Sequence, residues 1–217
     1  MSPFIHVIRH AQALHNVHQN FSIHDPLLTE RGHEQCRVAQ TQLGDLNQIE
    51  VIFSSPLRRT IQTALALFPE YTEANKRIVL MPDLQEVGST PSDTGSSREY
   101  LESKYGCVLD YSLLTSDWTD KSEDSNYSPQ SAKERAARTR LFIQAIAQKY
   151  ADKEVNIVVV SHGNYLRLLT KDEEFFSNVE RRTYVFNPTS GGSSETDLLE
   201  TPHSISMRQG HLLRQLL

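Results

Sequence analysis

The chain has 217 residues, of which 38% are hydrophobic, and its 22 basic and 27 acidic residues give a formal net charge of −5. This length and apolar content suffice to bury one sizeable core, so we expect a single domain over residues 1–217. An acidic chain without a basic cluster argues against nucleic acid and anionic membranes as partners. Any affinity for phosphate therefore has to be local.

The cysteines and the start of the chain predict its compartment. Cys36 and Cys107 lack the Cys-x-x-Cys spacing of a redox or metal site, which indicates reduced thiols in an intracellular protein. No basic segment followed by an apolar one precedes the first predicted strand, and the longest β-branched run, 157–160, is too short for a bilayer. We predict a cytoplasmic location and leave a nuclear one open. The sequence does not indicate an oligomeric state.

Strands and helices alternate along the first half of the predicted structure. Thr29 is placed to cap a helix that ends near residues 44–47. Ser55 and Pro56 are the expected N-cap and first residue of a second helix, whose apolar face runs to Phe68. Runs of β-branched and aromatic residues predict strands at 4–8, 51–53 and 78–80.

A His-rich stretch, residues 15–24, separates the first strand from the first helix. His15, His18 and His24 do not repeat the spacing of a helical metal-binding pair, and no cysteine or carboxylate cluster accompanies them. We therefore expect these histidines to lie in a solvated loop.

The second half surrounds a long irregular segment. Residues 89–130, apart from a short helix at 98–105, are expected to form a cap over the fold. Ser131 opens a capping-box motif and a long amphipathic helix. Residues 155–160 form the most apolar strand, which suits the centre of a parallel sheet. The remaining predicted elements are a helix from about Asn164, a strand at 182–186, a mobile loop at 187–206 and a short terminal helix or strand at 210–217.

This alternation predicts an α/β fold. We expect a three-layer sandwich, with a mostly parallel central sheet, helices on both faces and the irregular cap over the carboxyl edge. Ligands collect at the carboxyl ends of such strands. Four separate segments place charged or titratable groups at that edge, namely Arg9 with His10, Arg59, Glu86 and His162. We expect an active site where these segments meet.

The residue types in this set suit phosphate chemistry. Arginine provides forked donors that match phosphate oxygens. A neutral His10 can attack phosphorus, and water can then hydrolyse the phosphohistidine. A protonated Glu86 can donate to the leaving alkoxide and later take a proton from that water. Asn16 and the helix start at Gly163 and Asn164 can add neutral donors.

No acidic cluster for Mg²⁺ and no glycine-rich phosphate loop accompanies these residues. We therefore expect neither a metal nor another cofactor. From the local pattern alone, Arg58 and Arg59 could equally be two solvated arginines on an exposed turn.

From residue 5 to about residue 170 the chain resembles the histidine phosphatase superfamily, which has the phosphoglycerate-mutase-like fold. The resemblance implies that His10 is the nucleophile and Glu86 the proton donor. It also implies that Arg9, Arg59 and His162 form the phosphate pocket, with Asn16 and Gly163 as further contacts, whereas Arg58 holds a variable position. The matching motifs are Arg9-His10-Ala11 with Asn16, Asp25-x-x-Leu28-Thr29-x-x-Gly32, Ser55-Pro56-Leu57-Arg58-Arg59-Thr60-x-Gln62-Thr63-Ala64, Leu84-Gln85-Glu86 and Ser161-His162-Gly163.

The chain departs from the usual pattern of this superfamily in three ways. Ala11 follows the nucleophile where glycine is usual, as in a plant and fungal branch that this chain is similar to. Residues 87–95 replace the usual Gly-x-x-Glu-Gly pattern after the acid motif. The long insert typical of true phosphoglycerate mutases has no counterpart, which favours hydrolysis over phosphate transfer between positions.

The sequence therefore predicts a metal-independent phosphatase that acts on a small phosphate monoester through a phosphohistidine. Two alternatives remain open, a phosphoglycerate-type mutase or bisphosphatase and a non-catalytic module that binds a phosphorylated ligand. Substrate specificity is expected to lie in residues 89–130 and 187–206. Side chains there that could contact a substrate or anchor the cap are Arg98, Tyr100, Tyr105 and Trp118.

Overall fold

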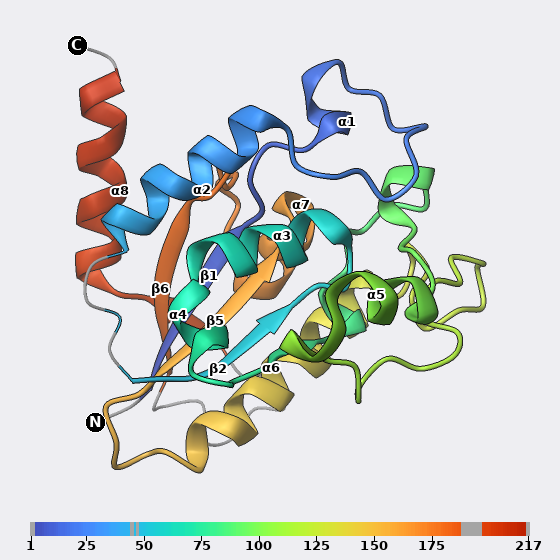
Figure 1. Ribbon diagram of the computed structural model, residues 1–217. Coiled ribbons are helices and arrows are strands. Elements are labelled where there is room, and N and C mark those ends of the chain that lie inside the picture. The colour runs from blue at the N-terminus through green and yellow to red at the C-terminus, as the bar shows by residue number, and fades with distance from the viewer. Residues whose placement is uncertain (1–2, 44–45, 47, 188–196, 216–217) are drawn as a thin grey trace.

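A computed structural model describes residues 3–43, 46, 48–187 and 197–215, and within these residues seven strands form one sheet (Figure 1). The strand order is β4-β3-β2-β5-β1-β6-β7. Neighbouring strands from β4 to β1 run parallel, whereas β6 and β7 are antiparallel to their neighbours. The predicted mostly parallel sheet is confirmed. The strands are β1 (Phe4–Arg9), β2 (Ile49–Ser54), β3 (Ile78–Leu80), β4 (Leu109–Asp110), β5 (Asn156–Ser161), β6 (Arg181–Phe186) and β7 (Leu198–Glu200).

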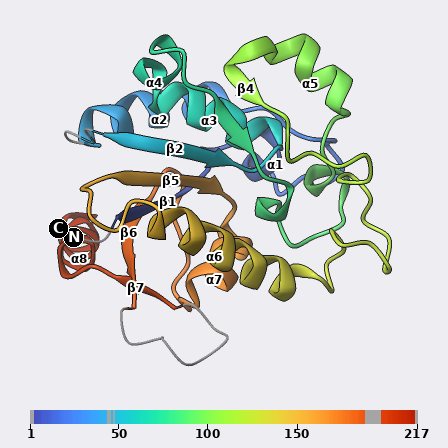
Figure 2. The same cartoon turned by 90° about the horizontal axis from the view of Figure 1, so that it is seen from below.

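Helices cover both faces of the sheet, as Figure 2 shows from below. The helices α2 and α3 pack against each other on one face, and α6 and α7 pack on the other. The three-layer α/β sandwich is therefore confirmed. The helices are α1 (Leu14–Val17), α2 (Glu30–Gln42), α3 (Arg58–Leu67), α4 (Pro69–Glu73), η1 (Pro82–Leu84), η2 (Pro91–Asp93), α5 (Arg98–Tyr105), η3 (Gly106–Val108), α6 (Ala132–Gln148), α7 (Gly163–Thr170) and α8 (Pro202–Gln215).

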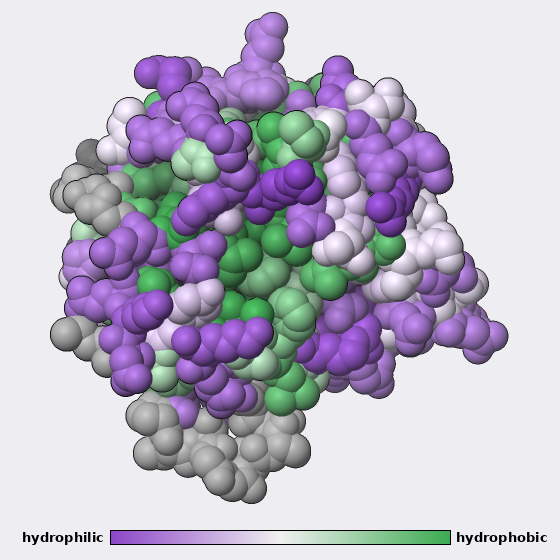
Figure 3. Space-filling model, turned by 60° about the horizontal axis from the view of Figure 1, so that its bottom comes forward, coloured by the Kyte–Doolittle hydropathy of each residue, from purple (hydrophilic) through white to green (hydrophobic). Residues whose placement is uncertain are grey.

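The hydrophobic core consists of two clusters, one on each face of the sheet. On the central strand β5, Val158 and Val160 belong to the cluster under α2 and α3, whereas Ile157 and Val159 belong to the cluster under α6 and α7. This alternation follows from the two-residue period of a strand, and it explains why the whole strand is apolar. On the face shown in Figure 3, hydrophobic side chains gather in the middle, inside a rim of hydrophilic ones.

Helix starts show where local motifs are sufficient and where they are not. The Thr29 hydroxyl accepts a hydrogen bond from the Gly32 N–H at 2.9 Å, so this predicted N-cap of α2 is confirmed. The prediction that Ser55 caps α3 is wrong, because the helix begins at Arg58. The Asp25 carboxylate accepts from the Arg58 N–H at 2.9 Å instead. A distant loop thus supplies the cap that the adjacent serine does not.

The predicted capping box at Ser131 is also wrong in detail. The helix α6 does start directly after Ser131, but the Ser131 side chain makes no capping hydrogen bond. Its hydroxyl donates backwards to the carbonyl oxygens of Asn126 and Ser128, at 2.7 and 2.9 Å. Ser131 therefore fastens the end of the cap to α6.

The cap, residues 89–130, is irregular as predicted and contains α5 at the predicted position, together with η2, η3 and the short strand β4. In Figure 1 it lies beside the carboxyl ends of the central strands. No described helix has the length and apolar composition needed to cross a membrane.

The predicted loop at 187–206 is wrong where the structure describes it, since residues 188–196 lie outside the described part. Leu198–Glu200 forms the edge strand β7, which pairs with β6, and α8 begins at Pro202. The predicted terminal element at 210–217 is the end of that helix, apart from residues 216–217, which are not described. Pairing with β6 makes a strand of only three residues, Leu198–Glu200, and a segment this short has too little periodicity to be predicted as a strand.

Candidate active site

One cavity of about 440 Å³ opens at the carboxyl edge of the sheet. Strand β1 leads into His10, β3 and η1 lead to Glu86, and β5 leads into His162, while Arg59 lies in the first turn of α3. The four predicted segments thus meet at one place. The cavity is lined by Arg9, His10, His15, Asn16, Gln19, Phe21, Arg59, Glu86, Asp93, Gly163, Asn164, Phe175 and Asn178.

His10 has the geometry of a neutral nucleophile. Its Nδ1 lies 2.7 Å from the Ala11 carbonyl oxygen, and because a carbonyl can only accept, Nδ1 carries the proton. The unprotonated Nε2 is then left with its lone pair. Burial, followed by the charges of Arg59 and Arg9, lowers the pKa of His10 well below its usual value. His10 is therefore neutral at physiological pH.

His162 stands directly behind His10, with 5.2 Å between the two ring centroids. Its Nε2 lies 2.8 Å from the Ser55 hydroxyl, which explains why this serine does not cap α3. Its Nδ1 is buried and has no partner among the described residues. Burial, followed by the charge of Arg59, lowers the pKa of His162 well below its usual value. A bound phosphate would favour protonation of this ring by its negative charge.

Two guanidinium groups supply the positive charge of the cavity. Arg9 donates to the Phe176 carbonyl oxygen at 2.7 Å, and Arg59 donates to the Ser92 carbonyl oxygen at 2.6 Å. The Nε of each arginine is buried without a partner in the described part of the chain, so each retains a donor for an anion. A Cβ at Gly163 would lie 3.2 Å from the Arg9 Nε. The absence of a side chain at this position leaves room for Arg9.

The Glu86 side chain lies beside the first residues of α7 and is partly exposed to the cavity. Its Oε1 accepts from the N–H groups of Val87 and Tyr165, at 2.8 and 3.0 Å, and its Oε2 accepts from Asn164 at 3.3 Å. Burial is the main cause that raises the pKa of Glu86, opposed by the Val87 hydrogen bond and reinforced by the charge of Asp93. Burial and the charge of Asp93 thus shift Glu86 towards the acid form that a proton donor requires.

His15 is a cavity residue that the sequence analysis placed wrongly in a solvated loop. It is buried, and its ring centroid lies 5.9 Å from that of His10. The short helix α1 turns His15 inward, and burial lowers its pKa to about 3. Its place beside the motif residue Asn16 was the available signal. His18 and His24 are exposed as predicted.

Other lining residues carried no sequence signal that identified them. The Asn178 side chain donates to the His10 carbonyl oxygen at 2.8 Å, which fixes the backbone at His10. Asp93 comes from the segment that replaces the usual pattern after the acid motif. The predicted contact Asn16 does line the cavity, while its Oδ1 accepts from the Ala13 N–H at 3.0 Å.

The cap side chains that were considered as substrate contacts do not line the cavity. Trp118 is buried, and a Cβ at Gly95 would lie 2.1 Å from its ring, so Trp118 anchors the cap. Arg58 donates to the Asp25 carbonyl oxygen at 2.7 Å and to the Tyr100 hydroxyl at 3.1 Å. Arg58 therefore points away from the cavity, in agreement with its variable position in the motif.

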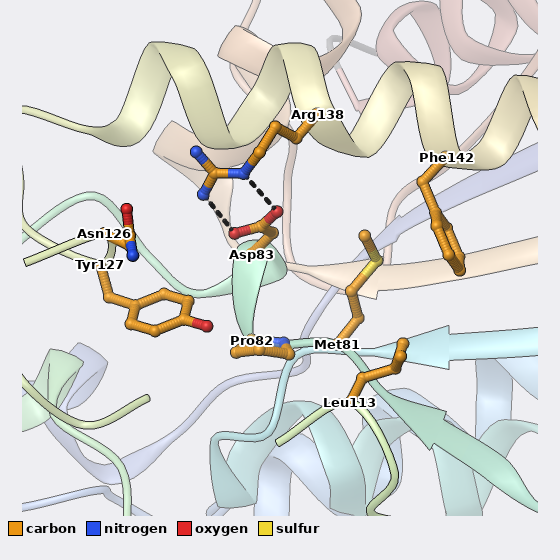
Figure 4. A pocket seen from close by; sticks show the side chains of 8 residues that line it. All are labelled: Met81, Pro82, Asp83, Leu113, Asn126, Tyr127, Arg138 and Phe142. Atoms are coloured by element: carbon orange, nitrogen blue, oxygen red, sulfur yellow. Dashed lines mark hydrogen bonds and ion pairs between the residues drawn. The ribbon is translucent and has the colours of Figure 1, made fainter. Parts of the chain in front are cut away.

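A second cavity of about 380 Å³ lies between β3, the cap and α6 (Figure 4). Its charged residues are Asp83 and Arg138, which form a two-bond ion pair at 2.7 and 3.1 Å. This pairing leaves no free cation to bind a phosphate there. Elsewhere too, the described residues contain no group of three or more His, Cys, Asp or Glu that could hold a metal ion.

The chain is similar to proteins that are named as phosphatases or as phosphoglycerate mutase-like proteins. A probable phosphatase of Schizosaccharomyces pombe is 30% identical over 171 residues, which are 77% of each chain. A phosphoglycerate mutase-like protein of Arabidopsis thaliana is 30% identical, over 75% of this chain and 71% of the relative. The solved structure of a mycobacterial glucosyl-3-phosphoglycerate phosphatase shares the fold, with a TM-score of 0.56 at 19% identity over 91% of this chain and 96% of that one.

The family model described as histidine phosphatase superfamily (branch 1) matches residues 5–189. This match covers most of the chain and includes every residue on which the cavity's predicted chemistry depends. The chain therefore belongs to the histidine phosphatase superfamily and is an enzyme of the phosphatase class.

Proposed function

We propose that the chain hydrolyses a small phosphate monoester through a phosphohistidine at His10, without a metal ion. The observation that carries this proposal is the hydrogen bond from the His10 Nδ1 to the Ala11 carbonyl oxygen at 2.7 Å. It leaves a neutral Nε2 free to act as nucleophile, in a cavity that also holds two guanidinium groups. The phosphatase names of the fungal relative and of the mycobacterial structure support the same activity.

The first step transfers the phosphoryl group to the enzyme. The His10 Nε2 attacks phosphorus, the bond from phosphorus to the ester oxygen breaks, and Glu86 protonates the leaving alkoxide. Arg9 and Arg59 neutralise the phosphoryl oxygens during transfer, which is the main contribution that a protein makes to this reaction.

The second step regenerates the enzyme. Water attacks phosphorus, the Glu86 carboxylate takes the proton of that water, and the bond from phosphorus to the His10 Nε2 breaks to release phosphate. Glu86 returns to its acid form, as its raised pKa favours.

A second candidate is a mutase or bisphosphatase acting on a phosphorylated glycerate or sugar. The name of the Arabidopsis thaliana relative, a phosphoglycerate mutase-like protein, supports it. A mutase would return the phosphate to a different position of the product, whereas a phosphatase releases inorganic phosphate. A non-catalytic binding module would bind phosphate esters without turnover, and it would have no use for a proton donor at Glu86.

The test is a panel of phosphate esters assayed with and without a chelator, on the wild-type protein and on His10→Ala. We expect release of inorganic phosphate that the chelator does not reduce, acid-labile phosphate on the wild-type protein, and a loss of at least about 10³-fold in kcat/KM for His10→Ala. His18→Ala, an exposed histidine from the neighbouring loop, is the matched control. Equal rates for His10→Ala and wild type would refute the proposal.

A further inference from the structure

A carboxylate stands in the wall of this otherwise cationic cavity. Asp93 is 8% exposed and lines the cavity together with His10 and Glu86. Its Oδ1 accepts from the outer nitrogen of Arg59 at 3.3 Å, and its Oδ2 accepts from the Thr90 hydroxyl at 2.9 Å. Asp93 and Arg59 thus form an ion pair in the wall of the cavity.

The surrounding backbone is shaped to hold this carboxylate. A Cβ added at Gly88 would lie 2.3 Å from the Asp93 Oδ2, so any larger residue at Gly88 would displace the acid. The turn η2 ends at Asp93, and the Ser92 carbonyl oxygen just before it binds the other outer nitrogen of Arg59. Residues 88–93 therefore present a carboxylate to the cavity at a fixed place.

The charges that line the cavity nearly cancel once a substrate binds. Arg9 and Arg59 contribute two positive charges and Asp93 one negative charge, while burial lowers the pKa of His10 and raises that of Glu86. A phosphate monoester brings up to about two negative charges at pH 7. Protonation of His162, whose ring lies 5.2 Å from that of His10, would balance the charge of the bound phosphate. A further anion on the leaving group would then create an excess of negative charge in a partly desolvated site.

The rest of the lining suits a neutral leaving group. It includes the buried His15, amide side chains such as Gln19 and Asn178, and two phenyl rings, Phe21 and Phe175, which are 47% and 54% exposed. The cap lysine Lys121 does not line the cavity, its ammonium donates to the Tyr127 carbonyl oxygen at 3.3 Å, and burial lowers its pKa to about 7. Lys121 is therefore held by the cap backbone and is not part of the cavity lining.

We propose that Asp93 is a specificity-determining residue, which restricts the enzyme to phosphate monoesters of neutral or cationic, partly apolar alcohols and phenols. Esters whose leaving group carries a carboxylate or a second phosphate are rejected by charge repulsion. This inference rests on the proposed phosphatase function. It also disfavours the phosphoglycerate-type mutase, whose substrate carries a carboxylate beside the phosphate.

The test uses three aryl phosphates that differ in the charge of the leaving group, namely phenyl, 4-carboxyphenyl and 4-(aminomethyl)phenyl phosphate. For the wild type we expect kcat/KM to be lowest for the carboxylated ester. Asp93→Asn keeps the shape of the side chain, and we expect it to raise kcat/KM for the carboxylated ester relative to the phenyl ester by about tenfold. Because the chemical reactivity of each ester is the same for every variant, this ratio isolates the effect of Asp93.

Asp124→Asn is the matched control, since Asp124 is an exposed residue of the same cap that does not line the cavity. We expect its ratio to equal that of the wild type. An unchanged ratio in Asp93→Asn, or an equal loss for all three esters, would overturn the proposal, because a purely structural role affects all esters alike. If Asp93→Asn does not fold, the wild type is tested alone. The inference is then refuted if kcat/KM of the wild type is not lowest for the carboxylated ester.

Failure of the phosphatase function has a different signature, since none of the three esters would then be hydrolysed. In that case calorimetric binding of the same esters to His10→Ala measures the charge preference without turnover. Weaker binding of the carboxylated ester supports the role of Asp93, and equal or tighter binding overturns it.

Discussion

Glu86 shows how the surroundings of a single carboxyl group determine its chemistry. An exposed glutamate is ionised at neutral pH and cannot protonate an alkoxide. Here burial raises the pKa of Glu86, and the neighbouring charge of Asp93 raises it further. The backbone N–H groups of Val87 and Tyr165 hold the side chain in place beside the cavity. The same residue therefore combines a raised pKa with a fixed position.

The raised pKa of Glu86 leads to a prediction of the pH dependence of the reaction. As the pH rises through the raised pKa of Glu86, the acid form disappears, so we expect kcat/KM to fall on the alkaline side. Glu86→Gln removes this fall, and we expect it to slow alkyl phosphates, whose leaving groups need a proton, by about 10²–10⁴-fold. Aryl phosphates are slowed less, because phenolates leave more readily.

Profiles of kcat/KM against pH for one alkyl and one aryl ester check this prediction. Glu123→Gln, which changes an exposed glutamate of the cap, is the control. If kcat/KM of Glu86→Gln fell on the alkaline side as it does in the wild type, another group would have to donate the proton to the leaving group.

At the scale of elements, one buried carboxylate joins a loop, a helix and the cap. Asp25 is fully buried, and its Oδ1 accepts from the Arg58 N–H at the start of α3 at 2.9 Å. Its Oδ2 accepts from the backbone N–H and the hydroxyl of Ser96, at 2.9 and 2.7 Å. Since Arg59 follows directly in α3, the position of this cavity residue depends on Asp25.

We expect Asp25→Ala to lower the free energy of unfolding by about 3 kcal/mol, because it removes these hydrogen bonds and leaves the Arg58 charge unpaired. Chemical denaturation measures this loss, and kcat/KM should fall with it because Arg59 is displaced. Asp124→Ala, at an exposed position, should change stability by less than about 0.5 kcal/mol. Equal stability of the two variants would show that Asp25 does not join the cap to α3.

At the scale of the whole molecule, four buried histidines couple stability to pH. Burial is the main cause that lowers the pKa of each of them, to about 4 for His6, to about 3 for His15, and well below the usual value for His10 and His162. In the unfolded chain these histidines take up protons near their usual pKa of 6.5, whereas in the folded chain they do not. The stabilisation is thus fully present above about pH 6.5 and is lost as the pH falls towards the folded pKa values.

We expect the free energy of unfolding to decrease between pH 6.5 and pH 5, by up to about 1.4 kcal/mol per pH unit for each of these histidines. Glu86 and Glu200, whose pKa values burial raises, act in the opposite direction. Urea denaturation at several pH values measures the slope. His6 lies outside the cavity. We expect His6→Gln to reduce the slope by the contribution of one histidine, and an unchanged slope would show that His6 does not contribute to the pH dependence of stability.

The sequence by itself determined the order of the elements, the parallel sheet and the place of the site. Strand and helix periods are local properties, and parallel strands necessarily bring their carboxyl ends to one edge. His10, Arg59 and Glu86 could therefore be placed in one cavity without coordinates. The resemblance to a family then assigned roles that residue types alone left open.

Only the tertiary structure decided which partner each polar side chain takes. The Ser55 hydroxyl contacts His162 as well as the Leu57 N–H just before α3. Ser131 turns back to the cap, and Asp25 caps α3 from another part of the chain. His15 was predicted to be solvated, and Asp93 carried no signal at all. A hydrogen bond or a buried charge depends on groups that are far apart in the sequence, and local periodicity holds no information about which of them will meet.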